Sequence, residues 1–301
     1  MASSMKRRQL RSGRRSGALM FGVGYGRTGK VWVDLTELPH LLLGGTTGSG
    51  KSVFLRQVLV RLVLDHGPEE LVLVLIDLKG GMEFQLFRGL PHLMGPVVSD
   101  MPQFWPAMDA VVAELERRMA IFSEAGVVSL RDWNERHPAD RKPYILVAID
   151  EYGELSLPGA ESSTGEARAQ RPAKAAHAAV SRIARLGRAC GIHLIACTQR
   201  PDNDVMPGQI KAQLPATVAL KTRGEVNSHI LLGDRNDGAA RLAPYKGRAV
   251  FQWETEEEVQ VPLLEPWDAA ALLAAKYGDL VGHARVTQCP TRSEEIDEVA
   301  A

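Results

Sequence analysis

Residues 40–52 of this 301-residue chain read HLLLGGTTGSGKS, and they carry its strongest structural signal. The short apolar run 40–44 is typical of a buried strand. It leads directly into Gly45, Thr46, Thr47, Gly48, Ser49, Gly50, Lys51 and Ser52, which match the pattern G-x-x-x-x-G-K-[ST] at every defined position. The stretch 51–65 then predicts a helix. A strand, a glycine-rich turn and a helix in this order predict a phosphate-binding loop.

Each part of this stretch has a physical task in holding phosphate. Glycines let the backbone curl so that successive N–H groups face inward around phosphate oxygens. The N-terminus of the following helix adds partial positive charge at the same place. We expect Lys51 to reach the β- and γ-phosphates of a nucleotide, and Ser52 to place its hydroxyl on Mg²⁺.

A second candidate site lies at the end of the apolar run 144–150, where Asp150 and Glu151 are adjacent. In enzymes with such a loop, an Asp at the tip of a neighbouring strand holds Mg²⁺ through water. An adjacent Glu can activate the attacking water, so the pair predicts hydrolysis in addition to binding. The 99 residues from Lys51 to Asp150 leave room for a further strand at 71–77, which is the arrangement of the RecA-like ATPases.

Further polar residues follow two other apolar runs. Gln199 comes directly after the run 192–198. Ligands of open α/β sheets bind beyond the carboxyl ends of the strands. Gln199 is therefore a candidate sensor of the γ-phosphate or of the attacking water, although a polar residue there can also act only as a strand cap. Asp77 and Lys79 end another run on the same edge and are candidate supporting residues.

The whole chain alternates between short apolar runs and stretches of helical character. Several runs are continuously apolar, which is typical of strands covered on both faces. This alternation predicts an α/β fold of the RecA-like (ASCE) P-loop NTPase class, with a mainly parallel sheet covered by helices on both faces. The last two runs are expected to form a hairpin at one edge. The expected strands are 31–35, 40–44, 71–77, 144–150, 192–198, 216–221, 248–252 and 259–264, and the expected helices are 51–65, 103–125, 171–190 and 266–276.

Charges are balanced in number, with 36 Lys and Arg against 36 Asp and Glu, but not in position. No acid precedes Asp34, whereas the last residues are acidic. We expect three parts: a basic, flexible arm over 1–30, a motor domain over 31–264, and a short helix with an acidic tail over 265–301. A basic arm can bind nucleic acid or an anionic membrane surface, or it can remain a solvated tail.

Composition excludes several classes of protein. Hydrophobic residues at 45% and charged residues at 24% are ordinary for a globular protein and exclude a mainly disordered chain. No window holds about 18 consecutive apolar residues, which excludes a transmembrane helix, and the start does not resemble a signal peptide. The three cysteines, Cys190, Cys197 and Cys289, form no CxxC pair. They argue against a disulfide scaffold or a zinc site and fit a reducing cytoplasm.

The expected helix 171–190 has two unlike faces. At about 100° per residue, Val180, Ile183 and Leu186 fall together on one arc, which we expect to pack on the sheet. The opposite, basic face can contact DNA or a neighbouring subunit's nucleotide, or it can simply be solvated. Its members are Arg171, Lys174, Arg182, Arg185 and Arg188.

Five separated blocks of the sequence resemble, in the same order, the ATPase core of the FtsK/SpoIIIE-type DNA translocases. They read PHLLLGGTTGSGKSVFLRQVL, LVLVLIDLKGG, ELERRMAIFSEAGVVSLRDWNE, YILVAIDEYGEL and RIARLGRACGIHLIACTQRP, and IKAQLPATVALKTRGEVNSHILLGD continues the match. The resemblance covers roughly 31–264. It implies that ATP hydrolysis moves double-stranded DNA through a homo-hexameric ring, with ATP and Mg²⁺ bound at each subunit interface.

The resemblance also assigns roles to single residues. Lys51 and Ser52 match the family's phosphate-loop lysine and its Mg²⁺ residue. Asp150 and Glu151 match its metal-associated aspartate and catalytic glutamate, and Gln199 matches the glutamine of its TQRP block. Lys51, Glu151 and Gln199 are therefore the expected catalytic residues, and Ser52 and Asp150 are the expected metal residues.

Two positions depart from the family pattern. Leu78 stands where the family commonly has Pro in its IDPKG block, and Ser228-His229 stands where it commonly has Ser-Arg. Rings of this kind are expected to use an arginine from the neighbouring subunit to stabilise transition-state charge. Because of His229, the position of that arginine stays open. The candidates are Arg223, Arg235, Arg241 and Arg248.

The overall pattern is similar to the short TraB-like conjugal transfer proteins of actinomycete plasmids and integrative elements. No membrane-spanning N-terminal domain is expected, and the 37 residues after 264 are too few for the winged-helix module that reads DNA orientation sequences. We therefore expect a cytoplasmic protein of conjugative DNA transfer, held at the inner face of the membrane if its basic arm meets a membrane or membrane-protein partner. The alternatives are a chromosome-segregation pump, an EccC-like secretion ATPase that moves protein, and a non-catalytic ATP-binding adaptor.

Overall fold

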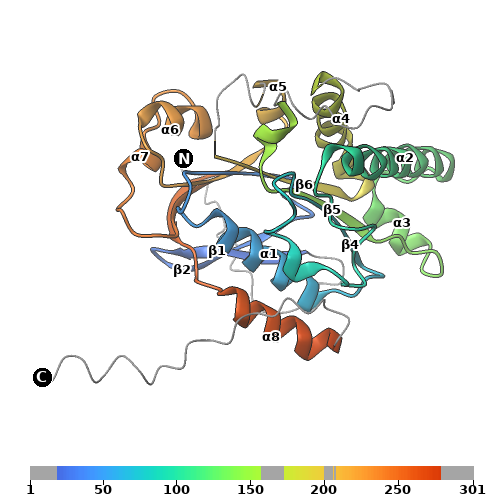
Figure 1. Cartoon of the computed structure of the whole chain (residues 1–301). Helices are drawn as coiled ribbons and strands as arrows, with labels where there is room; N and C mark the ends of the chain where they lie inside the picture. The colour runs from blue at the N-terminus through green and yellow to red at the C-terminus, as the bar shows by residue number, and fades with distance from the viewer. Residues whose placement is uncertain (1–18, 157–172, 200–205, 207, 279–301) are drawn as a thin grey trace, which may run out of the picture.

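One mixed sheet organises the chain. The computed structural model describes residues 19–156, 173–199, 206 and 208–278. Within them, nine strands form one sheet in the order β2-β1-β9-β8-β7-β3-β6-β5-β4, with helices on both faces (Figure 1). The strands are β1 (Met20–Gly26), β2 (Gly29–Asp34), β3 (His40–Gly44), β4 (Leu71–Ile76), β5 (Tyr144–Ile149), β6 (Ile192–Thr198), β7 (Ala216–Leu220), β8 (Arg248–Gln252) and β9 (Glu256–Gln260).

The helices connect these strands and lie on either side of the sheet. They are α1 (Lys51–Asp65), α2 (Met101–Ala125), α3 (Leu130–Arg136), α4 (Ala173–Cys190), α5 (Gly208–Lys211), α6 (Glu225–Leu232), α7 (Gly238–Arg241) and α8 (Pro266–Tyr277). Two short 3₁₀ turns, η1 (Gln85–Phe87) and η2 (Tyr152–Ser156), follow β4 and β5.

The centre of the sheet is parallel and confirms the predicted RecA-like fold. Strands β7, β3, β6, β5 and β4 run in the same direction. Every residue of β3, β5, β6 and β7 is buried, which explains why their sequences are continuously apolar. The strand predicted at 71–77 forms as β4, but it lies beyond β5. The strand inserted between β3 and β5 is β6, in which Ile195 pairs with Leu41 on one side and Ala148 on the other.

The antiparallel part of the sheet corrects two predictions. β8 and β9 form the predicted hairpin, but it is internal to the sheet because β1 and β2 extend the sheet beyond it. β9 covers 256–260 instead of 259–264. Its first three residues are glutamates, so the sequence pattern did not indicate where the strand begins. These glutamates nevertheless pair with β8, and within β9 only Val259 is buried.

The predicted flexible arm over 1–30 is also wrong in its extent, because β1 and the start of β2 fall inside that range. Phe21 and Val23 of β1 are buried in the core. Gly24 permits the close approach of β9, since a Cβ at this position would lie 2.8 Å from the carbonyl oxygen of Gln260. The glycines therefore make β1 hard to recognise as a strand in the sequence, and Gly24 allows β1 to pair with β9. Residues 1–18 lie outside the described part of the chain.

The two faces of the sheet are covered by different helices. α1 and α8 pack on one face, where Phe54 and Leu273 join a common apolar cluster. α2 and α4 pack on the other face through Leu115 and Val180. Figure 1 shows these two layers on either side of the strands. Among the described helices, none combines the length and the apolar character needed to cross a membrane.

The predicted helices are confirmed with small shifts at their ends. α1 has the predicted bounds, 51–65. α2 begins before residue 103 because the side chain of Asp100 accepts a hydrogen bond from the backbone N of Gln103 (2.9 Å) and caps the helix at Met101. α8 ends at Tyr277, one residue later than predicted. Residues 171 and 172 of the fourth predicted helix lie outside the described residues.

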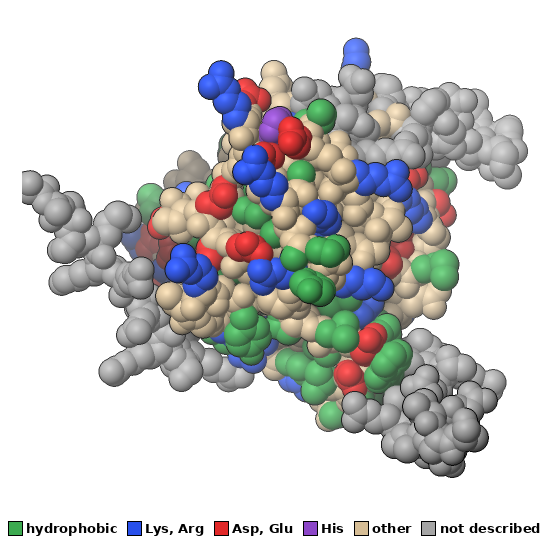
Figure 2. Space-filling view, turned by 90° about the vertical axis from the view of Figure 1, so that its left-hand side faces the viewer, with side chains coloured by type: hydrophobic (Ala, Val, Ile, Leu, Met, Phe, Trp, Pro, Cys, Tyr) green, Lys and Arg blue, Asp and Glu red, His purple; other side chains and the backbone are tan. Residues whose placement is uncertain are grey.

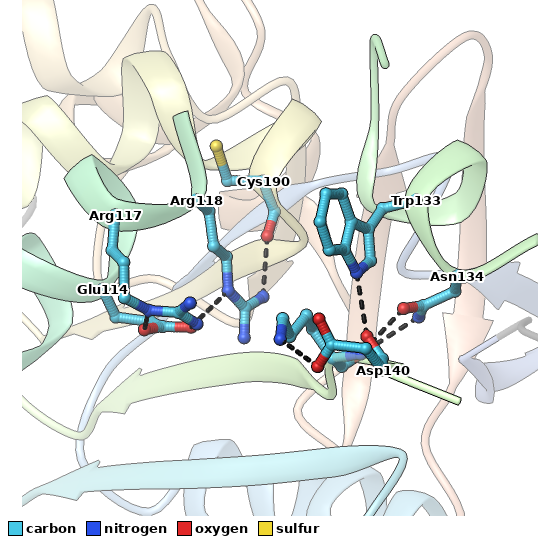
Figure 3. Close-up of polar contacts among 8 residues, drawn as sticks. Glu114, Arg117, Arg118, Trp133, Asn134, Asp140 and Cys190 are labelled. Carbon is cyan, nitrogen blue, oxygen red and sulfur yellow. Dashed lines mark hydrogen bonds and ion pairs between the residues drawn. The ribbon is translucent and has the colours of Figure 1, made fainter. Parts of the chain in front are cut away.

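A buried arginine ties α2 to the end of α4 (Figure 3). Arg118 is 1% exposed. Its Nε donates a hydrogen bond to Oε1 of Glu114 (2.7 Å), and its Nη1 donates to the carbonyl oxygen of Cys190 (2.8 Å). That carbonyl belongs to the last turn of α4, whose carbonyl groups lack partners within the helix. Arg118 thus fixes the end of α4 against α2, directly before β6 begins.

Candidate nucleotide-binding site

The loop between β3 and α1 has the backbone that its glycines predict. Gly45, Gly48 and Gly50 have φ angles of 151°, 77° and 114°. Residues with a Cβ rarely adopt these values. Behind the loop, both the backbone N and the Oγ1 of Thr46 donate to the carbonyl oxygen of Lys221 (3.1 Å each). The curl is therefore held by the end of β7 as well as by its own turn.

Lys51 points back into this curl. It is 7% exposed, and its Nζ donates to the carbonyl oxygens of Gly45 (2.7 Å) and Thr46 (3.3 Å). Burial lowers the pKa of Lys51, and the nearby charge of Glu151 opposes that shift. Phosphate oxygens are stronger partners for an ammonium than carbonyl oxygens, so the loop fits a polyphosphate. Ser52 follows at the second position of α1 and is half-buried.

Asp150 directly follows β5 and is buried among like charges. Burial, together with the charges of Glu83, Asp77 and Glu151, raises the pKa of Asp150 to about 7, although the charge of Lys51 opposes the shift. Ionising several carboxylates close together is costly because they repel one another, and a bound divalent cation would offset this repulsion. The carboxylate oxygens and the serine hydroxyl of the loop are oxygen donors of the kind that Mg²⁺ prefers.

Glu151 is held from two neighbouring strands. Its carboxylate accepts hydrogen bonds from the backbone N of Gln199 (3.1 Å to each oxygen) and from Oγ1 of Thr198 (3.1 Å). The Nζ of Lys79 lies 3.5 Å from its Oε2. The ends of β4 and β6 therefore position a single buried carboxylate beside the loop.

Gln199 lies between the loop and this carboxylate. Its backbone N contacts Glu151, and its Oε1 accepts a hydrogen bond from Oγ1 of Thr47 (2.5 Å). Its role as a sensor of the γ-phosphate stays a prediction. Arg200 lies outside the described residues.

Asp77 and Lys79 have separate tasks. Asp77 accepts hydrogen bonds from the backbone N of Lys79 and of Glu83 (3.0 Å each), so it shapes the turn after β4. Lys79 extends from this turn and contacts both Glu151 and Glu154 (3.5 Å each). The turn thus presents one cation to the carboxylate that follows β5.

Lys221 is a residue of this site that sequence reasoning missed. Besides receiving the two hydrogen bonds from Thr46, it donates from Nζ to the carbonyl oxygens of Ala240 and Leu242 (2.6 Å each). Lys221 therefore connects the phosphate loop to α7 and the segment after it. Its position at the carboxyl end of the predicted strand 216–221 is a signal that could have identified it.

The two faces of α4 lie as the sequence predicts. Val180 and Ile183 are fully buried on the sheet side. On the other side, Arg182 forms an ion pair with Glu116 of α2 (2.7 Å). What the basic face binds stays a prediction. Its exposed members within the described residues are Lys174, Arg182, Arg185 and Arg188, and Arg171 lies outside them.

The four candidate arginines differ in their contacts. Arg241 and Arg248 each form an ion pair with a nearby carboxylate. Arg223 and Arg235 are exposed and form no ion pair within the described residues. Arg235 has a φ of 66° and is alone among the described non-glycine residues in having a positive φ, a strain that is often found at functional sites. The face of the molecule in Figure 2, on the side of α6 and α7, mixes basic, acidic and apolar side chains.

A phosphate loop after one central parallel strand, carboxylates after another and a third strand inserted between them define a P-loop protein of the RecA-like class. The model of the FtsK/SpoIIIE family matches residues 1–203, and the chain belongs to this family. It is 37% identical over 231 residues to the DNA translocase FtsK of Helicobacter pylori, covering 75% of this chain and 25% of that protein. It is 36% identical over 218 residues to the protein of the same name in Campylobacter jejuni, covering 71% and 22%. The chain spans about a quarter of the length of these curated relatives.

Two solved structures are similar in fold to most of this chain. The pCW3 conjugation coupling protein TcpA, in a monomer form with ATPgS, is 27% identical with a TM-score of 0.74, over 87% of this chain and 71% of that one. The cytoplasmic domain of the type VII secretion ATPase EccC of Thermomonospora curvata is 24% identical with a TM-score of 0.73, over 91% of this chain and 32% of that one. The second likeness supports the fold alone.

Proposed function

We propose that this chain is the ATP-driven motor of a double-stranded DNA translocase. The observation that carries the proposal is the placement of Glu151, which is buried beside the phosphate loop and held by Gln199 and Lys79. A protein that only binds nucleotide has no need of a carboxylate held in this place. The FtsK/SpoIIIE family membership and the relatives named as DNA translocases support DNA as the cargo.

The residues of the chain divide the chemistry among them. The loop N–H groups and Lys51 bind the β- and γ-phosphates. Ser52 and Asp150 are the residues that would hold Mg²⁺, which neutralises phosphate charge when bound. Glu151 orients the attacking water and accepts its proton as a general base. Gln199, whose side chain contacts Thr47 of the loop, senses whether the γ-phosphate is bound and transmits this to β6.

We propose conjugative DNA transfer as the setting of this motor. The likeness to TcpA supports it, because that protein is a conjugation coupling protein and the similarity covers most of both chains. The motor would act as a homo-hexameric ring around DNA on the cytoplasmic side of the membrane, with the basic N-terminal residues contacting a membrane or a membrane protein. A role in chromosome segregation would use the same motor and is the alternative setting.

ATP turnover with and without long linear double-stranded DNA tests the proposal, with Lys51→Ala as the blank. We expect DNA to stimulate turnover, and the stimulation to weaken steeply as salt is raised, because contacts of Lys and Arg with phosphate release counterions. Turnover that ignores DNA at low salt and high protein concentration would contradict a DNA motor. That outcome would favour a protein cargo, as in secretion ATPases of the EccC type.

A further inference from the structure

A hydrogen-bonded chain of three side chains joins the segment after Glu151 to α4. The hydroxyl of Tyr152 lies 2.6 Å from Nδ1 of His177, and Oγ of Ser156 lies 2.9 Å from Nε2 of the same ring. The rings of Tyr152 and His177 also contact each other, with centroids 5.2 Å apart. Tyr152 and Ser156 are the first and last residues of η2, so one imidazole on α4 holds both ends of this turn.

Burial makes these hydrogen bonds important for the position of η2. Tyr152 is fully buried, and a buried hydroxyl that loses its hydrogen-bond partner is costly because water cannot replace that partner. Burial lowers the pKa of His177, which keeps the ring neutral near pH 7. A neutral imidazole has one donor and one acceptor, and a hydroxyl can take either role, so the ring satisfies Tyr152 and Ser156 together.

His177 lies at the border between the two faces of α4. On one side of it, Ala176 and Val180 are buried in the core. On the other side, Lys174 and Arg185 are exposed on the basic face. Lys174 is three residues before His177, which places the two side chains as neighbours on the helix surface. A ligand on the basic face therefore acts within one turn of the hydrogen bonds to η2.

We propose that His177 is a positioning residue that fixes η2, and through it Glu151, to α4. On one side Glu151 is anchored by β6, through Thr198 and Gln199. On the other side the chain runs straight into Tyr152 and so into the imidazole. The part of this inference that names DNA rests on the proposed function: phosphates bound on the basic face of α4 would displace the helix, and His177 would pass this displacement to Glu151.

Exchanging His177 for leucine and for glutamine tests the link. His177→Leu removes both hydrogen bonds, whereas His177→Gln keeps one acceptor and one donor. We expect His177→Leu to lower kcat for ATP by about tenfold or more, since a misplacement of 1 Å can cost about 10²-fold, with KM changed less than kcat. His177→Gln should restore most of kcat. His66→Leu is the matched control, because His66 contacts Glu70 after α1.

Hydrogen exchange of the amides in 152–156 provides a readout that needs no turnover. His177→Leu should speed this exchange, and His66→Leu should not. Unchanged kcat and unchanged exchange in His177→Leu would overturn the inference. A His177→Gln variant with kcat as low and amide exchange as fast as those of His177→Leu would also overturn it. If wild-type turnover ignores DNA while His177→Leu still lowers kcat and speeds exchange, the DNA motor is contradicted and the positioning role is supported.

Discussion

Asp150 and Glu151 are adjacent in the sequence but have unlike surroundings. Glu151 accepts hydrogen bonds from β6 and lies beside Lys79. Asp150 is buried near other carboxylates, and its pKa is raised to about 7. A carboxylate surrounded by donors and a cation is held in one orientation, while one surrounded by like charges gains from binding a cation. We therefore propose that Glu151 serves as the base and Asp150 as the metal ligand.

Glu151→Gln replaces the base with an amide of the same shape. Because a general base typically contributes about 10²–10⁴-fold, we expect turnover to fall within that range while nucleotide stays bound. ATP hydrolysis and binding of a fluorescent ATP analogue measure the two effects. Lys51→Ala should instead weaken the binding itself. Wild-type turnover in Glu151→Gln would exclude Glu151 as the base.

A pair of buried histidines should make the fold sensitive to acid. Burial lowers the pKa of His40 to about 3 and that of His193 to about 4. A histidine of the unfolded chain titrates near 6.5, so between about pH 6.5 and 4 these two rings bind more protons in the unfolded chain than in the folded one, and their contribution to stability falls as pH falls. The raised pKa of Asp150 acts in the opposite direction over this range, but it is one group against two. Each ring contributes up to about 1.4 kcal/mol per pH unit in that window. Urea unfolding at pH 7.5, 6 and 5 measures this slope.

His193→Asn provides the control for this prediction. In the native chain Nδ1 of His193 contacts the carbonyl oxygen of Pro39 (3.1 Å), and an asparagine amide can donate in the same place. The variant should show a shallower loss of stability between pH 6.5 and 5 than the wild type. An equal slope in both proteins would mean that other groups cause the acid sensitivity.

At the scale of elements, the sequence predicts those strands and helices that a short stretch of residues determines by itself. The central strands are continuously apolar because helices cover both of their faces, and α1 begins where Gly50 ends the loop. β1 was not predicted as a strand, because the glycines that let β9 approach it also make its sequence less apolar. The insertion of β6 between β3 and β5 depends on pairing between distant segments, which no short window of sequence encodes.

The residues of the candidate site also fall into two groups, those that a short stretch of sequence marks and those that depend on how distant elements pack. Lys51, Asp150, Glu151 and Gln199 were predictable because a motif or a strand end marks each of them, and parallel strands bring their carboxyl ends to one edge. His177 was not predictable, because its contacts with η2 depend on how α4 packs. A side chain that acts between two elements leaves no pattern within either one.

Truncation at two points separates β1 from the residues before it. Removing 1–18 leaves β1 in place, so we expect little change in Tm and weaker binding to DNA or to anionic vesicles. Removing 1–26 deletes the buried Phe21 and Val23, each worth about 1.5–3 kcal/mol, and should lower Tm clearly. Unchanged affinity after the shorter truncation, at several salt concentrations, would show that the basic segment is only a solvated tail.

Charge reversal on α4 tests its basic face. Arg185→Glu with Arg188→Glu should weaken DNA binding and make the slope of log K against log salt shallower, by about 0.9 for each phosphate that the variant no longer neutralises. Arg131→Glu with Arg136→Glu on α3 is the matched control, since both arginines are exposed. Equal effects from the two pairs would indicate only a change of net charge.

At the scale of the whole molecule, the proposed ring requires residues that act across a subunit boundary. Arg241 and Arg248 are engaged by carboxylates of their own chain. Arg223 and Arg235 are exposed, and the backbone of Arg235 is held in a costly conformation. Lys221 links the phosphate loop to α7, which follows Arg235 closely in the chain. We therefore favour Arg235 as the arginine that serves the neighbouring nucleotide.

Subunit mixing tests this assignment. Arg235→Ala alone should be nearly inactive, because each intact site lacks its arginine, and Lys51→Ala alone is inactive because its own sites fail. In a random equal mixture, about one quarter of the head-to-tail interfaces join an intact site to an intact arginine, so turnover should return. Arg241→Ala is the control and should keep most activity by itself. Recovery with Arg223→Ala but not with Arg235→Ala would move the role to Arg223, and recovery with neither would argue against an arginine supplied in trans from this segment.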